Sequence, residues 1–313
     1  MGGWTSVIVS RATPAAGIQG LPPRLRGEGR GEGFSERCAR PPGVVLSGEV
    51  KDILLERNRP VLERLARSRA MLAFDYDGVL AALITDPEGA PMRRSTERLL
   101  ARVATRWPCA VVSGRSYAHV RRLTHGIVPT VVGNHGYELG RARPVPRAVL
   151  DRVRGWRAVL EQELAGKAVY FEDKRSTLSV HYGFGRRWRT VEVAVRRAAG
   201  SLDGTRIVQG KKVLNLIPAG FPDKGDAVRA LLRRLRVDAA LYAGDDVTDE
   251  DAFAVGSPLV VGVRVGSGRS SAPYRLASQD RIDELLEVLL ELRSVSTGAG
   301  TRSRRGVLDR GTR

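Results

Sequence analysis

Apolar residues along the chain follow two patterns, short continuous runs and longer stretches with helical spacing. The short runs have the composition of buried strands, and they lie at 71–74, 110–112, 130–132, 239–243 and 259–263. Apolar positions that recur every three or four residues predict amphipathic helices at 48–67 (broken near Pro60), 95–106, 223–235 and 282–292. Because strands and helices alternate, the pattern predicts an α/β fold with a doubly wound parallel sheet.

The alternation changes between residues 140 and 217. Two pairs of strands separated by a helix are predicted there, after an initial helix, at 149–164 (helix), 168–174, 177–182, 188–199 (helix), 206–210 and 211–218. Strand pairs joined by short turns predict a small antiparallel sheet with helices on one face. We therefore expect a smaller α+β domain at 139–217, inserted into a core built from 46–138 and 218–293.

The two ends of the chain show no such periodicity. Residues 1–45 are rich in Gly, Pro and Arg, and residues 294–313 are polar and basic. Both compositions predict disordered tails. Because the organised pattern begins only near Val45, we also expect the physiological start to lie downstream of Met1.

Composition narrows the class of partner. A net charge of +18 suits an anionic substrate or non-specific nucleic-acid binding. The aromatic content is 5%, without interleaved aromatic and basic residues, so the sequence favours a small anionic substrate over nucleic acid. No apolar run reaches the length of a membrane span and no secretory pattern is present, so we expect a cytoplasmic protein without a membrane partner. Cys38 and Cys109 suggest neither a disulfide framework nor a thiolate metal site.

The stretch LAFDYDGVL at 72–80 carries the first candidate chemistry. Asp75 and Asp77 follow the apolar run two residues apart, which in an extended chain points both side chains to one side. Such carboxylates would meet at the carboxyl end of a strand, where parallel sheets bind ligands, and would repel each other without a cation or a shared proton. The pattern indicates a divalent-metal site with one carboxylate left for covalent or acid/base work. A strand followed by an Asp-rich turn is the alternative.

Three further strand or helix ends carry polar groups that would lie at the same end of the parallel sheet. Ser113 follows the second strand, Lys224 begins a helix, and the stretch 245–251 has five acidic residues among seven directly after a strand and a glycine. Ser113 alone is consistent with a turn, Lys224 with a solvated helix residue, and 248–251 with a capping box. The density of carboxylates at 245–251 favours a site for a hard cation instead.

Together these features resemble the haloacid dehalogenase (HAD) superfamily of phosphotransferases, which has a Rossmann-like core. The motifs DYDGVL, SGR, a lysine at a helix start and GDD with a further Asp occur in the order typical of that superfamily, over residues 70–292. The resemblance implies that Asp75 is the nucleophile that forms an aspartyl-phosphate and that Asp77 is the acid/base. It implies that Ser113 and Lys224 hold the phosphoryl oxygens. The implied cofactor is Mg²⁺, with ligands drawn from Asp75, Asp77 (through its carbonyl), Asp245, Asp246 and Asp249.

Lys224 follows Ser113 by 111 positions, which exceeds a normal crossover connection, so the segment between them must hold the inserted domain. In the superfamily such a cap closes over the active site and recognises the substrate. GDDVTDEDAF, GNHGYE, EDK and HY are similar to motifs of the trehalose-6-phosphate phosphatase family. This resemblance implies hydrolysis of trehalose 6-phosphate, with substrate contacts from Gly114, Arg115, His135, Glu172, Lys174, His181, Lys212 and Asn215.

The chain departs from the family pattern at four cap positions. Asn215 and Ile217 replace the usual Glu and Arg after GKKV, Gly183 replaces the Arg after His-Tyr, and Arg175 replaces the Gly after EDK. A sister phosphatase for another glycosyl phosphate, such as glucosylglycerol or glucosylglycerate phosphate, is therefore an alternative. A non-catalytic sugar-phosphate sensor is a second alternative. For the oligomeric state we expect a monomer.

Overall fold

The computed structural model describes residues 51–84, 91–142, 144–210 and 212–305, with side chains as far as residue 296. The predicted tail at 1–45 and residues 306–313 lie outside the described residues. The helices are η1 (Glu56–Asn58), α1 (Arg59–Arg67), α2 (Arg94–Ala104), α3 (Tyr117–Leu123), η2 (Asn134–Gly136), α4 (Arg147–Glu163), α5 (Trp188–Gly200), α6 (Lys224–Leu235), η3 (Val247–Asp249), α7 (Glu250–Phe253), η4 (Gln279–Arg281) and α8 (Ile282–Arg305). The strands are β1 (Lys51–Asp52), β2 (Ala70–Phe74), β3 (Cys109–Val112), β4 (Thr130–Gly133), β5 (Glu138–Leu139), β6 (Tyr170–Asp173), β7 (Leu178–His181), β8 (Thr205–Gly210), β9 (Val213–Pro218), β10 (Ala239–Gly244), β11 (Val260–Val265) and β12 (Tyr274–Leu276).

The larger sheet has the strand order β1-β12-β11-β10-β2-β3-β4-β5. Its neighbours are parallel except for β4 and β5, which pair antiparallel. Because β2 lies between β10 and β3, the chain winds outward from β2 in both directions. This arrangement confirms the predicted α/β class and places the ends of β2, β3 and β10 side by side.

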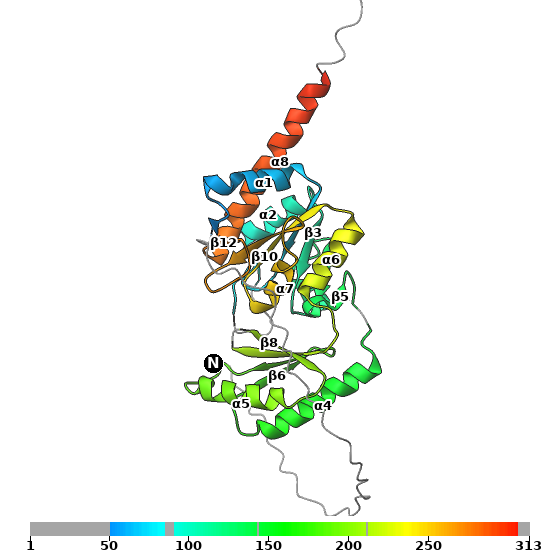
Figure 1. Ribbon diagram of the computed structural model, residues 1–313, viewed down its shortest axis with the longest axis vertical. Helices are drawn as coiled ribbons and strands as arrows, with labels where there is room; N and C mark the ends of the chain where they lie inside the picture. Colours follow the sequence, from blue (N-terminus) through cyan, green and yellow to red (C-terminus); the bar gives the residue numbers. More distant parts are fainter. Residues whose placement is uncertain (1–50, 85–90, 143, 211, 306–313) are drawn as a thin grey trace, which may run out of the picture. The chain divides into compact units, whose positions relative to one another are not determined.

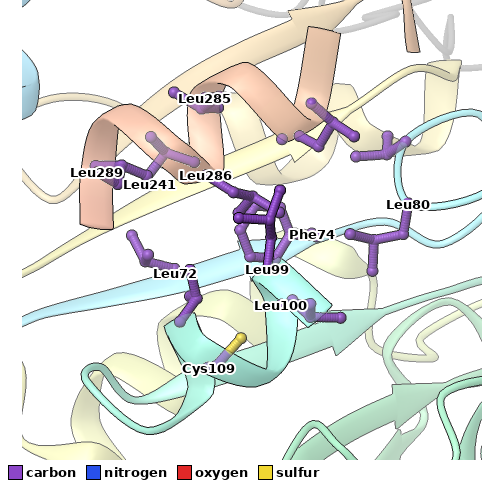
Figure 2. Close-up of a cluster of buried hydrophobic side chains, with 14 of the residues drawn as sticks. Leu72, Phe74, Leu80, Leu99, Leu100, Cys109, Leu241, Leu285, Leu286 and Leu289 are labelled. Carbon is purple, nitrogen blue, oxygen red and sulfur yellow. The ribbon is translucent and has the colours of Figure 1, made fainter. Parts of the chain in front are cut away.

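Helices cover both faces of this sheet because its strands carry apolar side chains on both sides. Leu72 and Phe74 of β2 face α1, α2 and α8, whereas Met71 and Ala73 face α6 and α7. Figure 2 shows Leu285, Leu286 and Leu289 of α8 beside the β2 side chains of the first cluster. The core therefore fixes β2, whose last residue directly precedes Asp75.

The second sheet has the order β6-β7-β9-β8, is antiparallel throughout, and comes entirely from residues 170–218. One face packs on α4 and α5 through Leu178, Val180 and Leu214 (Figure 1). Alternation along the strands puts Ser179, His181 and Asn215 on the other face. This separate sheet with its two helices is the α+β unit that the change of periodicity predicts.

Two segments differ from the predictions. Residues 51–58 form β1 and η1 instead of part of a helix, and α1 begins only at Arg59, because Pro60 is tolerated in the first turn of a helix and not in its interior. At the other end, α8 continues to Arg305, past the predicted end near residue 292. Among the described helices, none combines the length and the apolar composition needed to cross a membrane.

Candidate active site

Asp75 is positioned by the end of β2. Its backbone N–H donates to the carbonyl of Ala243 on the neighbouring strand β10, at 2.9 Å, and the residue is 6% exposed. One carboxylate oxygen accepts from the N–H of Tyr76 and the other from Nζ of Lys224, at 2.6 and 2.7 Å. Burial raises the pKa of Asp75 well above its ordinary value, although the charge of Lys224 opposes this.

Lys224 reaches Asp75 from the first residue of α6. That helix start is fixed by a capping box between Asp223 and Asp226. The Lys224 side chain is 1% exposed, and its Nζ donates to Asp75 Oδ2 and Asp249 Oδ1, both at 2.7 Å. Burial lowers the pKa of Lys224, but the two carboxylates outweigh burial and raise the pKa above its ordinary value. Lys224 is therefore a fixed positive charge beside the candidate nucleophile.

Asp249 joins the lysine to the loop after β10. Its Oδ1 also accepts from the hydroxyl of Tyr242, at 2.7 Å, and its Oδ2 accepts from the backbone N–H groups of Asp245 and Asp246, both at 2.9 Å. Both oxygens thus hold two hydrogen bonds each, and the residue is fully buried. This saturation suits a group that positions its neighbours.

Asp75, Asp245 and Asp249 form a carboxylate cluster. One oxygen from each lies within 4.8 Å of the others. Burial and then the charges of Asp249 and Asp246 raise the pKa of Asp245 to about 7, so negative charge in the cluster is not fully compensated by the protein. Oxygen donors with excess negative charge fit a hard divalent cation such as Mg²⁺. Gly78, at a φ of 74°, leaves the space that the Asp245 carboxylate occupies.

The Asp77 side chain points elsewhere. Its carboxylate accepts two hydrogen bonds from the guanidinium of Arg115, from Nε at 2.6 Å and from Nη2 at 2.9 Å. Arg115 comes from the loop after β3, so this bidentate pair joins two strand ends of the sheet. Asp246 also lies outside the three-residue cluster, and its carboxylate forms a capping box with Asp249 at η3.

Ser113 and Gly114 lie at the end of β3 beside the loop of residues 133–136. Ser113 is 1% exposed, and its carbonyl accepts from the N–H of His135 at 3.1 Å. The His135 ring lies against Gly114, where an added Cβ would come within 2.5 Å of Cε1. The structure thus brings the SGR and GNHG motifs together, because they follow the neighbouring strands β3 and β4.

Three of the predicted sugar-binding residues meet on the cap sheet. Glu172 Oε2 lies 2.9 Å from His181 Nε2 and 3.6 Å from Lys174 Nζ. Burial raises the pKa of Glu172, but the hydrogen bond with His181 and the charge of Lys174 outweigh burial and lower the pKa to about 2. Glu172 is therefore an ionised acceptor held in a fixed position, which suits recognition of sugar hydroxyls.

Asn215 lies in the same transverse row of the sheet as Glu172, with Ser179 between them. It is 5% exposed, and its Oδ1 accepts from the Ser179 hydroxyl at 2.7 Å. Lys212, by contrast, extends toward the ring of Trp188, with Nζ at 5.3 Å from the ring centroid, and its methylenes fill the space above Gly183. The structure thus does not bring Lys212 into contact with the Glu172 group.

Several residues of the site belong to none of the sequence motifs. Ser179 belongs to it only through strand pairing, and Tyr242 only because it contacts Asp249 from inside β10. Arg206 of β8 forms an ion pair with Asp251 of α7 at 3.4 Å, a contact between the cap sheet and the core. Strand alternation could have predicted the face of the sheet on which Ser179 lies. Its neighbour Asn215 could not be predicted, because the register that pairs them is a property of the folded chain.

Comparison with known proteins gives a family for this site. The trehalose-phosphatase family model matches residues 73–280, which include the core motifs and the cap. A trehalose-phosphate phosphatase of Mycobacterium marinum is 32% identical over 257 residues, which cover 75% of this chain and 65% of the relative. The chain thus spans slightly less than two thirds of the length of this relative.

Solved structures give the same fold. The C-terminal domain of the Candida albicans trehalose-6-phosphate phosphatase aligns with a TM-score of 0.66 at 20% identity, over 78% of this chain and 98% of that domain. A HAD subclass IIB sugar phosphatase aligns with a TM-score of 0.51 at 14% identity, over 70% of this chain and 98% of the other. The fold is that of the HAD superfamily, and the chain belongs to the trehalose-phosphatase family.

Proposed function

We propose that this chain is a Mg²⁺-dependent phosphatase that hydrolyses trehalose 6-phosphate to trehalose and phosphate through an aspartyl-phosphate intermediate. The observation that carries the proposal is the buried contact at 2.7 Å between Asp75 and Lys224, next to a cluster of further carboxylates. A nucleophile, a fixed positive charge and a cation site then lie together at the carboxyl ends of the strands of the larger sheet. We infer that these strand ends and the cap residues together bind a phosphosugar substrate in the cytoplasm.

The first step is attack by a carboxylate oxygen of Asp75 on the phosphorus atom. The bond between phosphorus and the sugar oxygen breaks, and that oxygen needs a proton because an alkoxide is a poor leaving group. Asp77 gives this proton, for which Arg115 must release at least one of its two hydrogen bonds to the Asp77 carboxylate. Lys224 and Ser113 hold the phosphoryl oxygens and offset the repulsion between the reacting anions.

The second step returns the enzyme to its starting state. Asp77, now ionised, takes a proton from water, and the water oxygen attacks phosphorus and displaces Asp75. Mg²⁺, held by Asp75, Asp245 and the Asp77 carbonyl, would supply charge neutralisation at the phosphoryl group. In this proposal Asp249 and Asp246 orient Lys224 and the loop after β10, and do not act as direct ligands of the metal.

The cap supplies recognition of the sugar. Glu172, held by His181 and Lys174, accepts hydrogen bonds from sugar hydroxyls. A second candidate substrate, another glycosyl phosphate, is favoured by one observation: the centre of the cap row is the neutral pair Ser179 and Asn215 where the family resemblance implies a carboxylate. Asp75, Asp77, Lys224 and Asp245 are all present, which argues against a sensor without turnover.

Phosphate release tests the proposal. The purified protein is given trehalose 6-phosphate, glucose 6-phosphate and glucosylglycerol phosphate, each with Mg²⁺ and with chelator. We expect metal-dependent release that is selective for trehalose 6-phosphate. Release from glucosylglycerol phosphate alone would instead make the pair of Ser179 and Asn215 the determinant of a different substrate, and release that chelator leaves unchanged would contradict the metal assignment.

A further inference from the structure

Arg206 of β8 has a guanidinium group that the protein satisfies only in part. Its Nη1 donates to Oδ2 of Asp251 at 3.4 Å, a looser contact than the two hydrogen bonds between Arg115 and Asp77. Its Nη2 is buried and, within the described part of the chain, has no hydrogen-bond partner. Buried polar atoms are satisfied in the large majority of cases, because leaving them unpaired costs free energy. A buried guanidinium arm without a partner therefore points to a ligand.

The pairing of the cap strands determines the side from which this guanidinium projects. Arg206 lies directly opposite Ile217 of β9, and Val208, two residues further along β8, lies opposite Asn215. Because side chains alternate along a strand, Arg206 is on the same face of the cap sheet as Asn215. The Ile217 side chain is apolar and offers no acceptor to Nη2. Arg206 therefore belongs to the face that we assign to the substrate.

The partner of Arg206 lies beside Lys224. The backbone carbonyl of Asp251 packs so closely on Gly225, the residue after Lys224, that an added Cβ at Gly225 would lie 2.2 Å from the carbonyl oxygen. A side chain at this position would therefore force Asp251 to move. The ion pair with Asp251 thus holds the guanidinium close to the helix start from which Lys224 reaches Asp75.

A second observation places Arg206 near Ser113. Burial, and after it the charges of nearby lysines and of Arg206, lower the pKa of His135 well below its ordinary value. The His135 ring lies against Gly114, directly after Ser113. The charge of Arg206 therefore acts near Ser113 as well as near Lys224. These are the two residues to which the proposed function assigns the phosphoryl oxygens.

Phosphoryl oxygens fit this arrangement, because a guanidinium binds phosphate through charge-assisted hydrogen bonds. We propose that Arg206 is a phosphate-binding residue contributed by the cap, whose Nη2 donates to a phosphoryl oxygen of the substrate while Nη1 remains paired with Asp251. This inference rests on the proposed function, because it adds a residue to that site. It links phosphate binding to the position of the cap, since one cap side chain then contacts both the phosphoryl group and the core.

The test separates the proposed contact with phosphate from the ion pair. Arg206→Gln removes the guanidinium, whereas Asp251→Asn removes its carboxylate partner and keeps the guanidinium. Arg197→Gln, at an exposed position of α5, is the matched control. The measurements are the calorimetric Kd for inorganic phosphate with Mg²⁺, kcat/KM with trehalose 6-phosphate and with p-nitrophenyl phosphate, and the melting temperature.

We expect Arg206→Gln to bind inorganic phosphate about tenfold more weakly than the parent, and Asp251→Asn to lose clearly less. Because the contact is to the phosphoryl group, kcat/KM should fall in Arg206→Gln by the same factor on both substrates. If Arg206→Gln lowers the melting temperature, Arg206→Lys replaces it. That variant keeps a charge beside Asp251 without a second arm, and it should also bind phosphate several-fold more weakly.

Three results would overturn the proposal. An unchanged phosphate Kd in both Arg206 variants would exclude the contact. Equal losses in Arg206→Gln and Asp251→Asn would mean that Arg206 acts only through the ion pair. A loss of kcat/KM for trehalose 6-phosphate alone would place Arg206 on the sugar and not on the phosphate.

The parent alone tests the proposed function. If it hydrolyses a different glycosyl phosphate, or none, the Kd for inorganic phosphate still tests Arg206, because the proposed contact does not involve the sugar. Failure to hydrolyse trehalose 6-phosphate is thus distinguishable from failure of the Arg206 assignment. A parent that binds no inorganic phosphate would contradict the assignment.

Discussion

The carboxylate of Asp77 and the guanidinium of Arg115 form a bidentate pair, with hydrogen bonds of 2.6 and 2.9 Å. The pair fixes the orientation of the candidate acid/base before substrate arrives. Arg115 contributes geometry as well as charge, because its planar fork matches both carboxylate oxygens.

Arg115→Lys should therefore fail to replace arginine. A lysine ammonium is a point charge and cannot hold both oxygens at once, so we expect kcat/KM for trehalose 6-phosphate to fall by about 10- to 100-fold. Steady-state kinetics with Arg121→Lys on α3, outside the site, as the control would check this. Parental kcat/KM in Arg115→Lys would mean that the bidentate pair is incidental.

Asp249→Asn should cost both stability and activity. The new amide would face the N–H groups of Asp245 and Asp246, and Lys224 would lose one of its two carboxylates. We expect the free energy of unfolding in urea to fall by about 3 kcal/mol. Tyr242→Phe, which removes a single donor to Asp249, should cost about 1 kcal/mol. Asp151→Asn changes an exposed residue of α4 and is the control. Equal losses in the free energy of unfolding in all three variants would contradict the role assigned to Asp249.

Asn215→Glu should improve the use of trehalose 6-phosphate. The Ser179 hydroxyl, which already donates to Asn215, can also donate to a carboxylate, and a carboxylate accepts from sugar hydroxyls more strongly than an amide does. We expect kcat/KM to rise by about fivefold, in keeping with about 1 kcal/mol for such a contact. An unchanged kcat/KM, with the fold intact by circular dichroism, would place Asn215 outside the recognition surface.

In acid the folded protein should lose the contribution that ionised Glu172 makes to its stability. The pKa of Glu172 is lowered from 4.5 to about 2, because its hydrogen bond with His181 and the charge of Lys174 outweigh burial. A depressed carboxyl pKa stabilises the fold above the unfolded value of 4.5, and this contribution disappears as the pH falls from 4.5 toward 2.

Glu172→Gln should thus be less stable than the parent at pH 7, and the difference should shrink between pH 4.5 and pH 2. Urea unfolding at several pH values measures it, with Glu161→Gln on α4 as the control. A difference that does not depend on pH would show that the charge of Glu172 is not what stabilises the fold.

The sequence predicted most of the core because the information there is local. The apolar run before Asp75 and the glycine before Asp245 mark strand ends, and parallel strands bring such ends together whatever the details of packing. Periodicity likewise separated the cap from the core. The start of α1 was wrong because helical spacing alone does not determine where a helix containing Pro60 begins.

The rest depends on register and side-chain direction, which the sequence does not encode locally. The neighbour of Asn215 is Ser179 because β7 and β9 pair in one register, and a shift by one residue would have turned both to the other face. Lys212 was predicted to bind sugar from its motif, yet it extends toward Trp188 through the space above Gly183. The saturation of Asp249 could not be predicted either, because Tyr242 approaches it from within a strand.

The central claim, that Asp75 catalyses hydrolysis of trehalose 6-phosphate, is tested most directly by measuring trehalose and phosphate release in one assay for the parent and for Asp75→Asn. The account predicts equal amounts of the two products from the parent with Mg²⁺, and loss of both in Asp75→Asn while circular dichroism remains unchanged. Release near the parental rate by Asp75→Asn, or no trehalose from the parent, would contradict it.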